Sequence, residues 1–183
     1  MTAPPPSAPH ALDLVIDFVN TLDVDAGTDA LTTPASLSAW LAEHGLLDGG
    51  VALGRGELGS ALELREALRA LLLAHNGAEP DDRAAGELER VARRGGLGVH
   101  FAADGAVTLA AHGEGFAAAL ARLLIPVAEA REDGSWPRVK ACRAPDCQWA
   151  FFDRSRNRSG VWCDMAVCGN RTKVRAYRRR APR

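Results

Sequence analysis

The chain has 183 residues, 47% of them hydrophobic, which suits one domain with a buried core and a smaller second unit. Its longest apolar stretch, 117–128, contains Arg122 and Pro126 and is shorter than the roughly 20 residues of a membrane helix, so we expect a soluble protein. The net charge of −1 combines two opposite regions, because residues 1–137 hold 9 Arg against 20 acidic residues and residues 138–183 hold 13 basic residues against 3 Asp.

The N-terminal part of the chain begins without a regular pattern and then becomes helical. Residues 1–10 contain four prolines and lack the basic start and apolar core of a secretion signal, so we predict a disordered tail. Apolar residues then recur at helical spacing in four segments, separated by breaks that contain glycine or proline. The predicted helices are 11–23, 34–45, 61–75 with Ser60 as its N-cap, and 80–95.

The spacing of apolar residues next changes from helical to alternating. Residues 97–101 and 107–109 alternate on either side of an Asp-Gly pair at 104–105, which predicts a β-hairpin. Helical spacing then returns over 114–132, where we expect a helix kinked at Pro126.

The end of the helical signals near 134–138 coincides with the reversal of charge. We therefore predict an α+β fold, with a mostly helical N-terminal domain over 11–135 that contains one small hairpin, and a second domain over 136–183. Formal charges of −11 and +10 on the two sides of this boundary indicate an acidic body with a basic, nucleic-acid-binding end. The alternative is that the acidic body docks its own basic end, because opposite charges within one chain also attract.

The four cysteines of the chain form two equally spaced pairs, Cys142 with Cys147 and Cys163 with Cys168. Structural zinc sites draw four thiolates from two such pairs, each on a tight turn. Two disulfides are the alternative, but without a secretion signal we expect a cytoplasmic protein, and thiols in the reducing cytoplasm bind metal rather than pair. We predict one structural Zn²⁺ ion.

The segment around the cysteines has its own predicted elements. Residues 148–153 and 161–163 are rich in strand-forming aromatic and β-branched residues, and a basic loop over 154–160 separates them. Residues 169–180 lack helix breakers after Gly169, which predicts a helix. A turn, a hairpin, a second turn and a helix follow one another in treble-clef or ribbon-like zinc fingers, so we expect that fold here.

Two parts of the sequence resemble known families. The pattern Cys142-Arg143-x₃-Cys147, Phe151-Phe152-Asp153, Ser155-Arg156-Asn157, Trp162-Cys163 and Cys168-Gly169-Asn170-Arg171 resembles the CGNR zinc finger. Upstream, Asp17-Phe18-Val19-Asn20-Thr21-Leu22, Trp40-Leu41 and Arg65-Glu66-Ala67-Leu68-Arg69 resemble the ABATE domain, which precedes this finger in bacterial proteins. The resemblance implies a transcription regulator that binds nucleic acid through the finger, with Gly169 and Asn170 supporting the metal ligands.

Basic residues are concentrated on the loop and the last helix of this finger. On the helix, Arg171, Arg175 and Arg178 share one face, and Val174 is left to pack on the metal core. Phosphates would offset the repulsion among these charges, and we expect DNA rather than RNA as the partner. The predicted nucleic-acid contacts are Arg154, Arg156, Arg158, Arg171, Lys173, Arg175, Arg178 and Arg179.

Aromatic residues of the finger have two alternative roles. Trp149 and Trp162 are expected to shield the metal site, as aromatic rings commonly do in small cores. The alternative is that Trp149, Trp162 or Tyr177 stacks on an unpaired base of a single-stranded target.

In the N-terminal domain, Asp17, Asn20 and Arg65 lie beside or within apolar helical patterns. One interpretation is a small-molecule pocket, which would make this domain a sensor that controls the finger. The interpretation that we favour is a buried polar network that fixes how the helices pack, because buried polar atoms need partners whether or not a ligand is present.

An enzymatic function is not expected. The five histidines are scattered, the metal claims every cysteine, and a zinc ion with four thiolates has no open position for water. The alternative to nucleic-acid binding is a structural zinc module for protein–protein interaction. A homodimer is also compatible with the sequence, because regulators that bind duplex DNA are often dimers.

Overall fold

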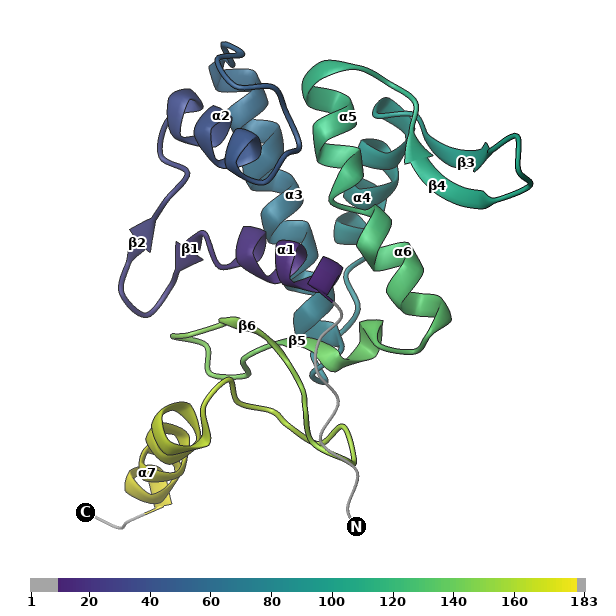
Figure 1. The fold of residues 1–183 in the computed structure, drawn as a ribbon. Coiled ribbons are helices and arrows are strands. Elements are labelled where there is room, and N and C mark those ends of the chain that lie inside the picture. The colour runs from purple at the N-terminus through teal and green to yellow at the C-terminus, as the bar shows by residue number, and fades with distance from the viewer. Residues whose placement is uncertain (1–9, 181–183) are drawn as a thin grey trace.

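The computed structural model describes residues 10–180, so the predicted disordered tail over 1–10 lies outside the described residues except for His10, which begins the first helix. The predicted α+β class is confirmed, because helices predominate and the strands form three small antiparallel pairs (Figure 1). The helices are α1 (His10–Val19), α2 (Pro34–Glu43), α3 (Arg55–Ala74), α4 (Asp82–Arg94), α5 (Gly115–Arg122), α6 (Ile125–Glu132) and α7 (Asn170–Arg180). The strand pairs are β1 (Leu22–Asp23) with β2 (Thr28–Asp29), β3 (Leu97–Phe101) with β4 (Val107–Ala111), and β5 (Val139–Ala141) with β6 (Ala150–Phe152). A 3₁₀ turn, η1 (Trp136–Arg138), precedes β5, and a π-helical turn, η2 (Met165–Gly169), precedes α7.

Helix α3 lies at the centre of the helical body. It packs against α1, α2, α4 and β5. Leu64, Leu68 and Leu72 follow one another at four-residue spacing on its buried face, where each is completely inaccessible to solvent. Val15 and Phe18 of α1 join the same continuous core. The leucine pattern in the sequence therefore corresponds to the packing axis of the body.

Helix α3 begins earlier than its sequence pattern indicates. The predicted N-cap, Ser60, lies inside the helix, and Gly54 is the cap instead. The carboxylate of Glu57 accepts a hydrogen bond from the Gly54 amide at 2.9 Å, which satisfies one of the unpaired donors at the helix start. The prediction was wrong because a glycine without a capping side chain is a weaker sequence signal than serine.

The single kinked helix that was predicted over 114–132 is two helices, α5 and α6, with a turn at Leu123 and Leu124. Pro126 explains the break. Its nitrogen carries no hydrogen to donate to the carbonyl of Arg122, and its ring crowds that carbonyl, whereas proline is well tolerated in the first turn of a new helix. Leu123 and Leu124 are both buried, so the interruption still contributes to the core.

The β3–β4 hairpin, here called the ribbon, projects from the body beside α4 and α5 (Figure 1). Its register pairs Leu97 with Ala111 at the base and Phe101 with Val107 near the tip. Gly105 makes the turn with a φ of +87°, a conformation that suits glycine. The predicted hairpin is confirmed.

The β5–β6 pair lies directly beneath the body (Figure 1). Val139 and Ala150 are buried in the same core as the leucines of α3. The predicted strand over 161–163 does not form. Instead, the carbonyl of Val161 accepts hydrogen bonds from the backbone of Arg143 and from the side chain of Asn76, and residues 161–163 belong to none of the described strand pairs.

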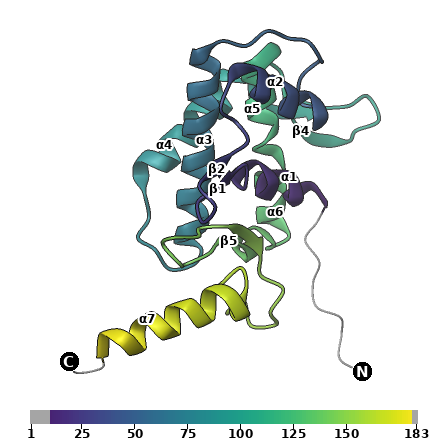
Figure 2. The same cartoon turned by 90° about the vertical axis from the view of Figure 1, so that its left-hand side faces the viewer.

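Helix α7 extends beneath the β5–β6 pair, on the far side of that pair from the helical body (Figures 1 and 2). Between residues 10 and 180, no helix combines the length and the apolar character needed to cross a membrane.

Candidate metal centre and basic surface

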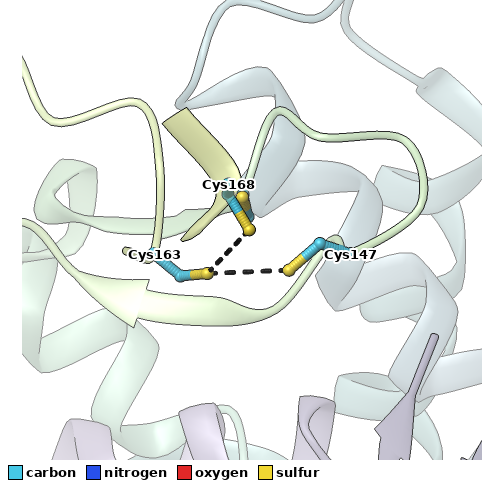
Figure 3. Close-up of side chains that lie close together, drawn as sticks. Cys147, Cys163 and Cys168 are labelled. Carbon is cyan, nitrogen blue, oxygen red and sulfur yellow. Dashed lines mark hydrogen bonds between the residues drawn. The ribbon is translucent and has the colours of Figure 1, made fainter. Parts of the chain in front are cut away.

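The four cysteine sulfurs gather at one point between the β5–β6 pair and α7. All four Sγ atoms lie within 4.8 Å of one another. Cys163 Sγ is 3.6 Å from Cys147 Sγ and 3.7 Å from Cys168 Sγ (Figure 3). Zn–S bonds of about 2.3 Å in a tetrahedron place sulfurs about 3.8 Å apart, so the cluster fits one Zn²⁺ ion, as predicted.

The first cysteine pair is held by a tight turn at the end of β5. The Cys142 amide donates to the carbonyl of Trp149 at 2.9 Å, and the Cys147 amide donates to the carbonyl of Ala144 at 2.9 Å. Gln148 has a φ of +54°, which lets the chain reverse directly after the second ligand. These contacts aim both thiols toward the same point.

The second pair depends on Asp164, whose role the sequence did not indicate. Its carboxylate accepts hydrogen bonds from the amides of Ala166 at 2.6 Å and Val167 at 3.0 Å, and so caps η2. The Cys168 amide donates to the Asp164 carbonyl at 2.9 Å. Aspartate is a common N-cap residue. Here it is a single residue between two metal ligands, so the sequence pattern alone does not identify the capped turn.

Gly169 and Asn170 have distinct structural roles beside the ligands. A Cβ at Gly169 would lie 3.1 Å from Cδ1 of Trp162 and would overlap the Met165 sulfur, so glycine permits this close packing. The Asn170 amide side chain donates to the carbonyl of Ala166 at 3.0 Å. Both residues therefore fix the turn that carries Cys168.

Burial opposes ionisation of these thiols in the absence of a cation. It raises the pKa of Cys147 to about 12, and it also raises the pKa of Cys163. Burial opposes ionisation of Cys168 as well, but the guanidinium of Arg171 donates to its sulfur at 3.3 Å, and on balance the pKa of Cys168 is lowered. Arg171 offsets the charge of one thiolate, and a bound metal cation would supply the positive charge that the other cysteines need in order to ionise.

Trp149 and Trp162 are half-buried and pack on the cysteine cluster, together with Phe151. This arrangement matches the prediction that the tryptophans shield the metal site. Tyr177 differs, because 75% of its surface is exposed. Val174 was expected to pack on the metal core and does not. It is 48% exposed and is not among the side chains that pack on the cysteine cluster.

Arg171 links the metal site to the helical body. Besides its contact with Cys168 Sγ, its guanidinium donates to Asp25 Oδ1 at 2.8 Å. Asp25 lies on the β1–β2 turn, 146 residues away in sequence. The hydrogen bond from Arg171, although partly opposed by burial, lowers the pKa of Asp25. Arg171 was predicted to contact phosphate, but in the structure its guanidinium already binds a carboxylate of the same chain.

Arg175 is also paired within the chain. Its two terminal nitrogens donate to the carboxylate oxygens of Asp146 at 2.9 and 2.8 Å, and this bidentate contact lowers the pKa of Asp146 to about 2. The alternative in which the acidic body docks the basic end thus describes Arg171, whereas Asp146 lies in the basic segment itself and pairs with Arg175 within the finger. Lys173 and Arg178 differ, because both side chains are exposed and no ion pair is described for either. The side chain of Arg179 lies outside the described residues.

The loop after β6 presents its arginines outward from a buried ion pair. Lys140 Nζ donates to Asp153 Oδ2 at 2.7 Å, and to the carbonyls of Arg158 and Gly160. The side chains of Lys140 and Asp153 are 6% and 2% exposed. Burial alone would raise the pKa of Asp153, but Lys140 and Ser155 donate to its carboxylate and the pKa is lowered. This ion pair, which sequence patterns did not reveal, holds the loop while the predicted contact residues Arg154, Arg156 and Arg158 are exposed.

Polar side chains of the body bind the backbone of the β5–β6 pair. Asn20 exchanges two hydrogen bonds with Ala150: its amide donates to the carbonyl at 3.0 Å, and its oxygen accepts from the backbone amide at 2.7 Å. Arg69, which is 2% exposed, donates to the carbonyls of Gln148 and Val19 at 2.9 and 2.7 Å. His75 Nδ1 lies 2.8 Å from the carbonyl of Val139. We call Asn20, Arg69, His75 and Asn76 the junction.

Asp17, Asn20 and Arg65, the three residues considered for a ligand pocket, have different surroundings. Asp17 is exposed, and Asn20 belongs to the junction. Arg65 is 4% exposed and forms a bidentate ion pair with Asp29 at 2.8 and 2.9 Å, which attaches the β1–β2 hairpin to α3. Asn20 and Arg65 therefore have polar partners within the chain, as the favoured interpretation expected. The hydrogen bonds of Asn20 also join the body to the finger.

Comparison with protein families gives two matches. A family model named ABATE and described as "Putative stress-induced transcription regulator" matches residues 12–132, about two thirds of the chain. A second model, described as "CGNR zinc finger", matches residues 138–181 and therefore contains all four cysteines. No curated protein gives a significant match to the sequence.

Proposed function

This chain belongs to the ABATE family and ends in a CGNR zinc finger, and we propose that it regulates transcription by binding nucleic acid, preferably DNA, through exposed basic residues of that finger. The observation that carries the proposal is the exposure of five basic side chains on a segment held by four thiols and a buried ion pair. They are Arg154, Arg156 and Arg158 on the loop and Lys173 and Arg178 on α7.

The loop and α7 both lie on the side of the molecule away from α2 and α5 (Figures 1 and 2). A polyanion can therefore approach both from the side that does not carry α2 and α5. Each phosphate contact releases condensed counterions, so a binding surface of this kind is driven by charge and weakened by salt. Arginine also forms bidentate contacts with phosphate or with guanine, which favours a duplex target read in the major groove.

Arg171 and Arg175 have a different role in this proposal. Arg171 supports Cys168 and contacts Asp25, and Arg175 is paired with Asp146. A phosphate would have to displace a carboxylate to reach either guanidinium. We therefore assign the phosphate contacts first to the five exposed residues, and we treat Arg171 and Arg175 as residues that position α7.

Zinc has a structural role in the proposal. Cys142, Cys147, Cys163 and Cys168 would hold it, and its charge would offset their thiolates while the closed coordination leaves no site for water. The chain's own residues then perform the binding. We propose no catalytic activity, and we expect the protein in the reducing cytoplasm, where the thiols remain available to metal.

Fluorescence anisotropy with labelled duplex DNA, at 50 to about 200 mM salt, tests the proposal. With four to six phosphate contacts, the affinity should fall with a log–log slope of about −4 to −5. The variant Lys173→Glu with Arg178→Glu should abolish binding at 100 mM salt, and so should Arg154→Glu with Arg156→Glu. Arg158 is left unchanged because its backbone has a φ of +54°.

The matched control is Arg55→Glu with Arg131→Glu, which makes the same change in net charge on exposed positions of the body. This control should retain affinity within about threefold, since only its long-range field changes. Equal loss in the control would mean that net charge alone governs binding. Tighter binding to single-stranded RNA than to duplex DNA would reverse the preference for DNA.

A second candidate function is a structural zinc module without a nucleic-acid partner. The contacts that favour it are the Arg171–Asp25 pair and the junction, since both attach the finger to its own body. Absence of binding to any DNA or RNA at 50 mM salt, with zinc content and folding intact, would support this function and reject the first.

A further inference from the structure

The two faces of the ribbon differ in composition. Alternation along both strands places one set of side chains on each face. The apolar face holds Leu97, Val99, Phe101, Val107, Leu109 and Ala111, and the opposite face holds Gly98, His100, Thr108 and Ala110. The ribbon therefore has a continuous apolar face, formed by cross-strand pairs of large side chains.

The outer half of the apolar face is uncovered within the described chain. Val99 is 52% exposed, Phe101 is 73% exposed and Val107 is 59% exposed. At the base, Leu97 is half-buried and packs against the core of the body. A two-stranded ribbon is marginally stable in water unless a further strand or a packed surface covers it. The exposed apolar pairs thus form a surface that requires a cover.

Charge limits what can cover this face. Between residues 97 and 111 the one formally charged side chain is Asp104, which lies at the tip. In the whole chain 25% of residues are charged, and the body carries a large negative charge. A nucleic acid or a charged helix would leave its own charges unpaired on an apolar surface, which is costly. An equally uncharged apolar surface is the complementary partner.

A second copy of the chain supplies such a surface. Figure 1 shows that the ribbon projects away from the body, so two ribbons can meet while the two acidic bodies remain apart. A twofold axis brings the same residues of both copies together, and identical faces without charge can be juxtaposed in this way without repulsion. Face-to-face packing of two β-layers also provides the missing cover.

We propose that two copies of this protein form a homodimer by packing the apolar faces of their ribbons around Phe101 and Val107. The two Phe101 rings and the Val99 and Val107 side chains form the centre of the contact. This interface involves neither the metal site nor the exposed basic residues of the finger. The proposal therefore stands independently of nucleic-acid binding.

Analytical ultracentrifugation of the full, zinc-loaded chain from about 1 to 100 µM tests the dimer. The wild type should sediment with twice the 19.4 kDa mass of one chain at the higher concentrations. The variant Phe101→Asp with Val107→Asp places four carboxylates at the twofold contact and should remain a monomer, with the dissociation constant raised at least 100-fold.

The matched control is His100→Asp with Thr108→Asp, which adds the same charges on the opposite face of the same strands. It should dimerise like the wild type within about threefold. The milder variant Phe101→Ala with Val107→Ala, which leaves the ribbon uncharged, should weaken the dimer at least tenfold. Circular dichroism and zinc content identify any variant that has lost its fold. A wild type that is monomeric at 100 µM, or a dimer that survives both apolar-face variants, overturns the proposal.

Discussion

The helical body and the finger are stabilised by different means. In the described chain, the largest fully buried side chains all lie between Leu12 and Val139, and they are Leu, Val and Phe residues. Around the metal site the finger buries only Cys142, Cys147 and Cys168 with Ala144, and half-buried aromatic rings surround them. Apolar burial at about 25 cal/mol per Å² can sustain the body. The finger has too little apolar surface for that and depends on its metal.

The two regions nevertheless share a boundary that is partly apolar and partly polar. β5 and β6 place Val139 and Ala150 in the core of the body, while Asn20 and Arg69 bind the backbone beside them. The first hairpin of the finger is therefore stabilised by the body rather than by zinc. The finger therefore has two parts: a strand pair that is docked on the body, and a metal-dependent segment that runs from Cys142 to α7.

The largest expected effect comes from removing the metal. Chelation of zinc, or Cys163→Ser, should unfold the segment from Cys142 to α7, because apparent zinc-binding energies in such fingers are about 10 kcal/mol or more. The body should keep its helical circular dichroism. Two-dimensional amide NMR can follow both parts residue by residue.

The corresponding test of the body is the substitution Leu68→Ala in α3, which should weaken the body and leave the metal site intact. A fully buried leucine contributes about 2–5 kcal/mol, so the melting temperature of the body should fall clearly. The protein should still bind one zinc ion at 20 °C, as measured by mass spectrometry under native conditions. If chelation melted the body as completely as it melts the finger, the two means of stabilisation would not be separable.

The junction should give the next largest effect. Asn20→Ala leaves both backbone groups of Ala150 without their partner, which should cost about 1–3 kcal/mol in the free energy of unfolding. Asp17→Ala, at an exposed position of α1 three residues before Asn20, is the control and should change little. Differential scanning calorimetry should show a broadened or divided transition for Asn20→Ala alone. An effect no larger than that of the control would contradict the role assigned to Asn20.

A smaller effect is expected from pH at His75. Burial lowers the pKa of His75 below 6.5, against the opposing hydrogen bond to Val139. The unfolded chain then binds more protons than the folded one, so the stability present above pH 6.5 declines as the pH falls from 6.5 through the lowered pKa. Chemical denaturation from pH 7.5 to 5.5 measures this decline, and NMR titration of the imidazole measures its pKa. His75→Gln, which can still donate to Val139, should flatten the dependence.

The smallest effect on stability is expected for Asp25→Ala. Asp25 is exposed, and exposed ion pairs contribute little to folding, so the melting temperature should not change measurably. Affinity for nucleic acid should rise about two- to fivefold, because Arg171 loses its closer carboxylate and keeps only Asp146 at 3.7 Å. Asp48→Ala, an equally exposed aspartate of the body, is the control. Equal affinities in Asp25→Ala and Asp48→Ala would show that the Arg171–Asp25 pair does not limit binding.

Much of the fold could be predicted because its signals are local. Leucine spacing identifies α3, Pro34 marks the start of α2, and the alternation after residue 96 identifies the ribbon. The metal ligands were equally accessible, since two evenly spaced cysteine pairs suffice to predict four thiolates at one ion.

The remaining features depend on contacts distant in sequence. No local pattern indicates that β6 pairs with three residues of β5 rather than with 161–163. The Arg171–Asp25 contact spans 146 residues, and charge asymmetry predicts attraction without naming the partners. Arg69 and Lys140 were missed for the same reason, because a basic residue that will be buried looks in sequence like any other surface charge.

The bond between Asn20 and Ala150 joins positions 130 residues apart, and this separation has a consequence for biosynthesis. Asn20 emerges from the ribosome long before Ala150, and domains generally fold as units in order of synthesis. The helical body can therefore collapse first and offer a finished platform to β5 and β6. The cysteine cluster is synthesised last, so it can bind zinc only after the body has folded. A nascent chain stalled before residue 140 should therefore already be compact, and adding zinc should not change it.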